Sequence, residues 1–280
     1  MSLWSGRKCD AAMAIFQYSF IQNAFIAGSA VAVVAGIVGY FLVTRGLTFA
    51  GHALSHIGFA GAAGALLLGI DPLFGMLIFT IIAGIGIGAL RRDLHEEDIN
   101  IGVIMMLMLG LGALFIALYN GYAEQAYSIL FGTILGISRT DVFVTLGIGF
   151  AAVAALAFIF RPLLFSSIDP EVAAARGVPV RALGIVFLII VAVAVSMSVQ
   201  VVGVLLIFTL LVGPAAVATR LATRPITAVA LSIGVGLAFT WSGILAAVIS
   251  GWPVAFCIAT VAFAVYLPVR LATADTGRRA

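Results

Sequence analysis

Charged residues are scarce in this chain. Asp, Glu, Lys and Arg together make up 9% of its 280 residues, against about 25% in ordinary soluble domains. The chain is 64% hydrophobic, and its mean hydropathy is +1.26. A globule of this composition would expose more apolar surface than water tolerates. The scarcity of charge therefore excludes a soluble protein and predicts an integral membrane protein.

Two further absences narrow the function. The chain has only two cysteines, Cys9 and Cys257, and they form no motif, so we expect no disulfide framework. It has no glycine-rich phosphate-binding loop, so we expect that it does not hydrolyse nucleotide by itself. Its formal net charge of +3 is too small to indicate a nucleic-acid partner.

What the chain does have is a series of long apolar runs. A helix needs roughly 20 apolar residues to cross a bilayer, and nine runs approach or reach that length. We therefore expect an all-α polytopic membrane protein in which residues 1–280 form a single transmembrane domain. Eight spans are the alternative, if the first run lies in the interface or two runs fuse. The nine runs are residues 23–43, 50–70, 72–90, 99–118, 141–160, 182–199, 201–219, 225–249 and 252–269.

The stretch 119–140 differs from these runs because its apolar part is too short to span and contains Gly132 and Gly136. We expect an external re-entrant or interfacial helix there, since irregular backbone at membrane depth is tolerated where it lines a cavity. Glu124 in this stretch is a weak candidate for guiding a cation; the alternative is a solvated carboxylate.

A polar segment at 161–181 separates the fifth and sixth apolar runs. Asp169 followed by Pro170 is typical of a helix start, because the carboxylate accepts backbone N–H bonds and proline suits the first helical position. Residues 171–176 are expected to form a short helix that ends at Gly177. The segment is either a solvated loop or a helix that docks on a partner at the membrane surface.

Arginine placement predicts the orientation, because loops rich in Lys and Arg stay in the cytoplasm. Arginines in the tail place the C-terminus inside, and four spans then place segment 161–181 inside as well. The arginines that set this orientation are Arg161, Arg176, Arg181, Arg220, Arg224, Arg270, Arg278 and Arg279.

Two histidines, His52 and His56, lie inside the second apolar run at positions i and i+4, so they share one helix face. Ser55 lies beside them. Such a pair can bind a borderline-soft divalent ion such as zinc; the alternative is a structural pair bonded to neighbouring carbonyls. The motif H-A-L-S-H resembles the zinc-peptidase H-E-x-x-H, but Ala53 stands where the catalytic glutamate belongs. A protease is therefore not expected, nor any other enzyme.

Four stretches together resemble the membrane permeases of ABC importers for zinc and manganese, and the match covers nearly the whole chain. They are R-G-L-T-F-A-G-H-A-L-S-H at 45–56, H-E-E-D-I-N-I-G-V-I at 95–104, L-F-G-T-I-L-G-I-S at 130–138 and D-P-E-V-A-A-A-R-G-V at 169–178. The resemblance implies a homodimeric permease in a bacterial-type inner membrane. Its implied partners are a cytoplasmic ABC ATPase dimer and a periplasmic or lipoprotein metal-binding protein.

The resemblance also assigns roles. Positions 52 and 56 are implied to face the translocation path, and many family members have an aspartate where His52 stands. Two nitrogens make a softer site, which favours zinc over manganese; the ion passes through and is not a bound cofactor. A stand-alone, proton-coupled transporter is the alternative, but it would not need a docking helix. The residues implied to couple the chain to the ATPase are Asp169, Pro170, Glu171, Ala174, Arg176 and Gly177.

Overall fold

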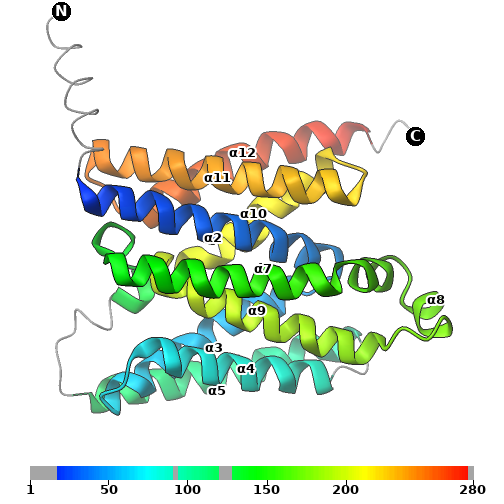
Figure 1. Ribbon diagram of the computed structural model, residues 1–280, viewed down its shortest axis with the longest axis horizontal. Helices are drawn as coiled ribbons and strands as arrows, with labels where there is room; N and C mark the ends of the chain where they lie inside the picture. Colours follow the sequence, from blue (N-terminus) through cyan, green and yellow to red (C-terminus); the bar gives the residue numbers. More distant parts are fainter. Residues whose placement is uncertain (1–17, 91–93, 120–127, 277–280) are drawn as a thin grey trace, which may run out of the picture.

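The computed structural model describes residues 18–90, 94–119 and 128–276, and in these residues the regular structure is entirely helical (Figure 1). The helices are α2 (Ser19–Thr44), α3 (Thr48–Leu67), α4 (Pro72–Leu90), α5 (Leu94–Leu118), η1 (Ile134–Gly136), α7 (Arg139–Ile168), α8 (Pro170–Ala175), α9 (Val180–Val202), α10 (Val204–Leu221), α11 (Pro225–Ser250) and α12 (Val254–Thr276).

Each of the nine apolar runs coincides with a long helix, which confirms the polytopic all-α fold. Within the described residues, eight helices are long and apolar enough to cross a membrane. The ninth long helix is α3, which has 20 residues and carries His52 and His56. It packs against α4, α5, α9 and α10, so its polar side chains are sheltered by neighbouring helices instead of facing lipid.

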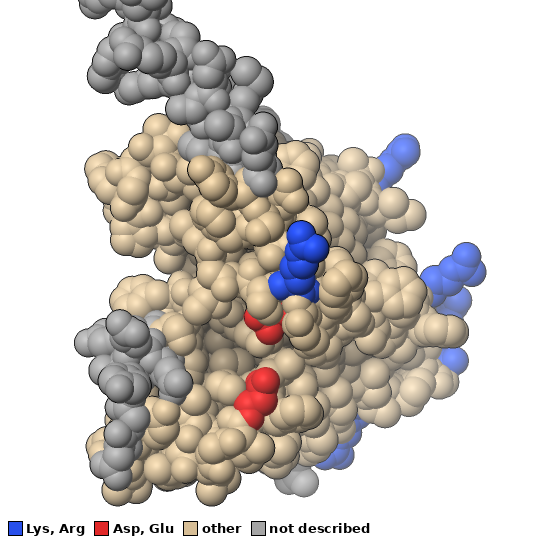
Figure 2. Space-filling model, turned by 60° about the vertical axis from the view of Figure 1, so that its left-hand side comes forward, with Lys and Arg blue, Asp and Glu red and all other residues tan. Residues whose placement is uncertain are grey.

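Most of the long helices run along the longest axis of the molecule and alternate in direction, so the bundle has two ends (Figure 1). Helix α2 begins at one end, while α8 and the end of α12 lie at the other. On the face that Figure 2 shows, the charged side chains lie toward these two ends, and the side of the bundle between them is nearly free of charge. The described arginines at or near the α8 end are Arg45, Arg161, Arg176, Arg181, Arg220, Arg224 and Arg270.

The core is centred on α2 and α9. Phe41 of α2 and Phe187 of α9 are fully buried, and their rings meet edge to face with centroids 6.0 Å apart. Hydroxyl groups join helices elsewhere: Thr80 on α4 and Ser196 on α9 lie 2.9 Å apart, and Ser232 on α11 donates to the carbonyl of Gly36 at 2.9 Å. Such bonds hold helices together where lipid offers no hydrophobic driving force.

Two glycines join the segment before α7 to the break between α9 and α10. Residues 128–131 form a helical turn, and Gly132 follows with φ +76°. Its backbone packs directly on that of Gly203, which has φ +84° and separates α9 from α10. Any side chain at either position would collide with the opposing main chain. This described part of 119–140 is short and irregular, as expected for a re-entrant segment.

One expected boundary was wrong. Helix α7 does not end at residue 160 but continues through Arg161 and Pro162 to Ile168. A proline removes one helical hydrogen bond, but later bonds survive, such as that from the N–H of Asp169 to the carbonyl of Phe165 at 3.2 Å. The polar segment therefore starts inside a helix, and only 169–179 connects α7 to α9. Helix α5 starts at Leu94, but its apolar span, Asp98–Leu118, agrees with the expected 99–118.

Candidate metal-translocation site

His52 and His56 lie on the second and third turns of α3, and their rings touch. The ring centroids are 4.6 Å apart and the ring planes meet at 86°. This geometry follows from the i, i+4 spacing, which brings side chains together on one helix face. Both side chains are half-buried, so they are neither sealed in the core nor fully open.

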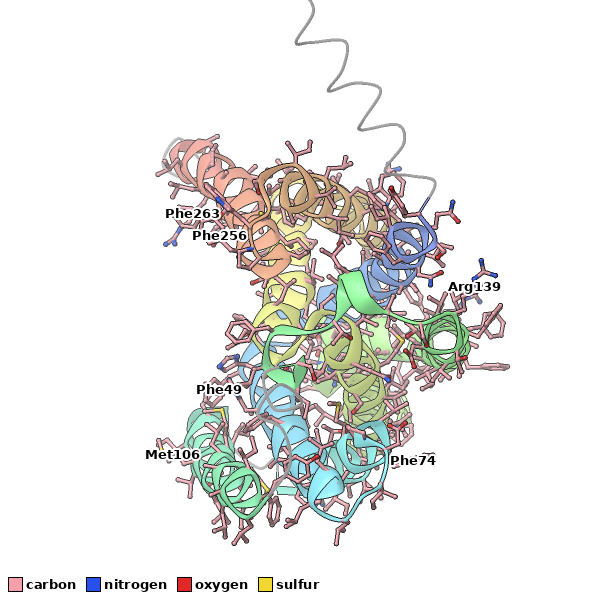
Figure 3. All side chains as sticks on the ribbon, turned by 90° about the vertical axis from the view of Figure 1, so that its left-hand side faces the viewer. Phe49, Phe74, Met106, Arg139, Phe256 and Phe263 are labelled. Atoms are coloured by element: carbon pink, nitrogen blue, oxygen red, sulfur yellow. The ribbon has the colours of Figure 1, made fainter. Side chains whose placement is uncertain are left out.

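Aromatic rings surround the pair. The ring of Phe208 on α10 meets that of His52 edge to face, with centroids 4.8 Å apart, and the Phe49 ring lies 6.5 Å from His52. Seen along the helices, Phe49 lies between α12, marked by Phe256 and Phe263, and α5, marked by Met106 (Figure 3). The apolar walls limit access of water, which strengthens any interaction between the imidazoles and a cation.

One ring nitrogen of this pair is unsatisfied. The Nδ1 atom of His52 is buried and has no hydrogen-bond partner among the described residues. Leaving a buried polar atom without a partner costs about 1–3 kcal/mol. Ser55 is different, because its buried hydroxyl donates to the carbonyl of Gly51 on its own helix at 3.1 Å. The histidines are therefore the stronger ligand candidates, and Ser55 is occupied by the backbone.

The pair does not form a closed cage. Within the part of the chain that the structure describes, no group of three or more His, Cys, Asp or Glu side chains could hold a metal ion. A structural zinc site has four ligands, whereas a site that passes an ion onward needs fewer. Glu124, the other candidate, lies outside the described residues. Among the described residues, the candidate site is therefore an open pair of imidazoles.

The short helix expected at 171–176 is present as α8, one residue earlier. The side chain of Asp169 caps it by accepting from the N–H of Val172 at 3.0 Å, and Pro170 takes the first position. At its end, Gly177 has φ +82°, and the N–H of Val178 donates to the carbonyl of Ala173 at 3.0 Å. The local chemistry read from the sequence thus produces the expected helix.

Most of the surface of helix α8 is exposed. Its one buried residue is Ala173, and the described side chains that remain exposed include Glu171 and Ala174. Arg176 is held against the bundle, with its guanidinium carbon 5.9 Å from the centroid of the Phe165 ring. Helix α8 projects beyond the end of the bundle (Figure 1), so a protein docked there would meet it first.

A contact that the sequence did not predict joins the segment before the histidine pair to the segment before α8. Arg45, in the turn between α2 and α3, bonds to Ser166 and Ser167 at the end of α7. The same guanidinium lies 5.8 Å from the centroid of the Phe187 ring. The arginine was recognised as part of a stretch resembling the family, but nothing local pointed to its partners, which lie more than 115 residues away.

A bundle of long apolar helices around a half-buried histidine pair, with a short exposed helix at one end, defines a polytopic membrane-transport protein. The chain matches the model described as "ABC 3 transport family" over residues 17–273, and it therefore belongs to this family. It is a permease subunit, which is a transport component and not an enzyme.

The names of similar proteins are those of transport-system membrane proteins. The chain is 31% identical over 236 residues to "Manganese transport system membrane protein MntC" of Halalkalibacterium halodurans, covering 84% of this chain and 81% of the relative. It is 34% identical over 203 residues to "Manganese import system permease protein ScaB" of Streptococcus parasanguinis, covering 72% of each. A chain of "PsaBC from Streptococcus pneumoniae in complex with Fab" superposes with a TM-score of 0.84 at 29% identity, covering 93% of this chain and 95% of that one.

Proposed function

We propose that this chain is the permease subunit of an ATP-driven ABC importer for a divalent transition-metal ion. The observation that carries the proposal is the touching pair His52 and His56, with an unpaired Nδ1 on His52, inside a chain of the ABC 3 transport family. Neutral imidazoles bind such ions. An incomplete ligand set suits a substrate that must leave the site.

The choice of ion rests on two observations that point in different directions. The relatives are named for manganese. In this chain, however, the pair at His52 and His56 supplies two nitrogens, and no described carboxylate joins them. Nitrogen ligands favour zinc, whereas oxygen ligands suit manganese. We therefore place zinc first and manganese second.

The proposed assembly contains two copies of this chain and a cytoplasmic ABC ATPase dimer. An external metal-binding protein, periplasmic or lipid-anchored, delivers the ion. Helix α8 is the coupling helix, since it is exposed at the end of the bundle where the arginines gather. The positive-inside rule places that end, and the end of α12, in the cytoplasm. The membrane is the inner membrane of a bacterial-type cell.

The test is metal uptake in cells that lack their own zinc and manganese importers and express the full set of subunits. His56→Ala should abolish uptake while the permease still assembles with its ATPase. His95→Ala is the matched control, because it makes the same substitution outside α3, and it should transport normally. Normal uptake by His56→Ala, at equal protein levels by blot, would show that the pair on α3 is structural.

A further inference from the structure

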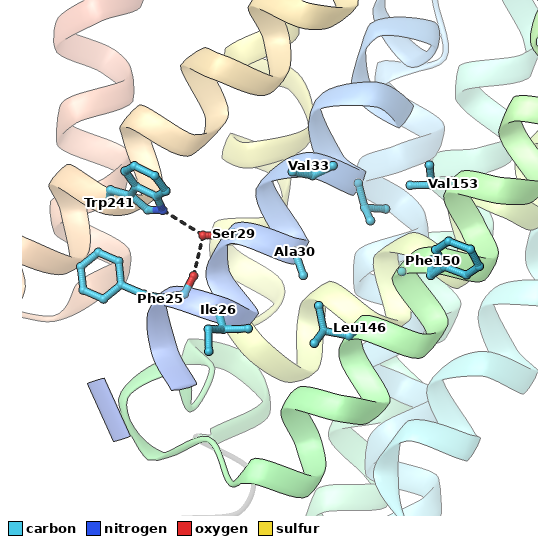
Figure 4. A pocket seen from close by; sticks show the side chains of 11 residues that line it. Phe25, Ile26, Ser29, Ala30, Val33, Leu146, Phe150, Val153 and Trp241 are labelled. Carbon is cyan, nitrogen blue, oxygen red and sulfur yellow. Dashed lines mark hydrogen bonds between the residues drawn. The ribbon is translucent and has the colours of Figure 1, made fainter. Parts of the chain in front are cut away.

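An apolar groove lies on the bundle surface, formed by α2, α7 and α11 (Figure 4). Its volume is about 590 Å³, and Ala30 and Val33 of α2, Leu146 and Phe150 of α7 and Trp241 of α11 are among its lining residues. The histidine pair lies elsewhere, on α3, which packs against α4, α5, α9 and α10. The groove is therefore separate from the candidate translocation site.

The few polar atoms in the groove are already bonded. The indole N–H of Trp241 donates to the hydroxyl of Ser29 at 2.9 Å, and that hydroxyl donates to the carbonyl of Phe25 at 2.6 Å (Figure 4). Since these groups need no outside partner, the groove offers nothing to a polar ligand. Its surface suits a hydrocarbon chain.

Among the described residues, one cation, Arg139, lies near the end of this apolar surface. Arg139 begins α7, and Leu146, Phe150 and Val153 follow at spacings of seven, eleven and fourteen residues, which places all four on one face of the helix. Figure 3 shows the Arg139 side chain projecting from α7 toward the side on which α2 lies. At 1.5 Å per residue, the arginine is about 10 Å along the axis from Leu146.

The Arg139 guanidinium is available for an anion. It is exposed and has no hydrogen-bond or ion-pair partner among the described residues. The nearest acid in sequence, Asp141, lies on another face of α7. Its carboxylate accepts bonds from the N–H and the hydroxyl of Ser138 at 3.2 and 2.6 Å in a capping box. The carboxylate is thus engaged by the helix start, and no described residue neutralises the positive charge of Arg139.

We propose that this groove binds an anionic phospholipid, with the phosphate on Arg139 and one acyl chain between α2, α7 and α11. The cation of Arg139 complements the negative phosphate of such a lipid, and the apolar groove complements its acyl chain. The two features also lie in the same order and at a similar separation as the phosphate and the chain. A second protein copy would need to present an acid to Arg139 beside an apolar ridge, whereas the bilayer supplies both features in one molecule. One arginine near a membrane surface contributes about 1 kcal/mol to the attraction of an anionic lipid.

Trp241 makes the proposal measurable, because it lines the groove and bromine on an acyl chain quenches indole fluorescence on contact. The full chain, with Trp4→Phe and Trp252→Phe so that Trp241 is the only reporter, is placed in vesicles containing brominated phosphatidylglycerol or brominated phosphatidylcholine. We expect quenching at about fivefold lower mole fraction of the anionic lipid, as about 1 kcal/mol implies.

Two variants, each with a control, test the binding of the lipid phosphate and of the acyl chain separately. Arg139→Gln should remove the preference for the anionic lipid, whereas Arg161→Gln, at the other end of the same helix, should keep it. Ala30→Phe should fill the groove and weaken quenching by both lipids, whereas Ala155→Phe, on the opposite face of α7, should not. Equal quenching by both lipids in the parent protein would overturn the proposal. Quenching by neither, as when a second copy covers the groove, would also overturn it.

Discussion

The Nη1 atom of Arg45 donates to the hydroxyl of Ser166 at 2.9 Å and to that of Ser167 at 3.2 Å. This contact joins the turn that leads into α3, the helix with the histidine pair, to the end of α7, the helix that leads into α8. Arg45 is seven residues before His52, and Ser166 is four residues before Pro170. Arg45 thus connects the segment before the histidine pair to the segment before α8 through polar contacts.

We expect Arg45→Lys to weaken this connection, because lysine has no planar guanidinium that can lie over the Phe187 ring while its Nη1 atom bonds to both serines. Charge-assisted hydrogen bonds contribute about 1.5–3 kcal/mol each. Uptake should fall more than zinc binding does, since the histidines are untouched. Measuring uptake, zinc binding and ATPase activity of the reconstituted importer would separate these effects. If binding is lost together with uptake, Arg45 supports the site and does not transmit movement.

His52→Asp should shift the preference of the importer from zinc toward manganese. The substitution replaces a nitrogen ligand with a harder oxygen, which manganese accepts more readily than a second imidazole. The measurement is competition between the two metals during uptake, at equal protein levels. His52→Asn is the control, since it also removes the imidazole but supplies no charge. An unchanged metal ratio in His52→Asp would mean that position 52 does not contact the ion.

Gly177→Pro should abolish transport while leaving insertion into the membrane intact. Gly177 has φ +82°, which proline cannot adopt, and its N–H donates to the carbonyl of Ala174 at 2.9 Å, which proline cannot do. Gly177→Asn should retain activity, because asparagine tolerates this conformation. Uptake and copurification of the ATPase are the measurements; normal transport by Gly177→Pro would reduce α8 to an ordinary connection.

Glu171→Lys should also abolish transport, because it reverses a charge on the exposed side of α8 without disturbing the fold. The variant should insert normally but lose its ATPase during purification. The charge-reversal control is Arg224→Glu, which lies at the same end of the bundle but outside α8. A control such as Ala155→Lys is unsuitable, because it would place a charge among the membrane helices. Retained ATPase binding in Glu171→Lys would show that this carboxylate lies outside the docking surface.

Cysteine labelling tests the orientation. In a background with Cys9→Ser and Cys257→Ser, a membrane-impermeant thiol reagent should label Thr140→Cys on intact cells, because residue 140 is exposed at the end opposite α8. Glu171→Cys should react only after the membrane is opened. The reverse pattern would invert the molecule and place α8 outside.

Local chemistry made much of this structure predictable. Apolar runs identified the nine long helices of the described residues, because each span must by itself be long and apolar enough to cross the bilayer. The carboxylate of Asp169, the ring of Pro170 and the freedom of Gly177 act on their nearest neighbours, so α8 could be placed from sequence. The contact between His52 and His56 followed from helical spacing alone.

Long-range packing was not predictable in the same way. Helix α7 continues past Pro162 to Ser166, whose hydroxyl accepts a hydrogen bond from Arg45 in the turn between α2 and α3. No residue near position 160 indicates this distant partner. The Phe208 ring on His52 likewise depends on how α10 crosses α3. The groove beneath Arg139 required three helices in their final positions.

The nine long helices of the described residues have a practical consequence for linking two copies. Helix α2 begins and α12 ends at opposite ends of the bundle (Figure 1), so in a membrane these two points face different compartments. Two copies joined from the end of α12 to the start of α2 could not be connected by a flexible soluble tether. Such a single-chain dimer would need an additional hydrophobic helix as its linker, of about 20 residues, to return the chain across the bilayer.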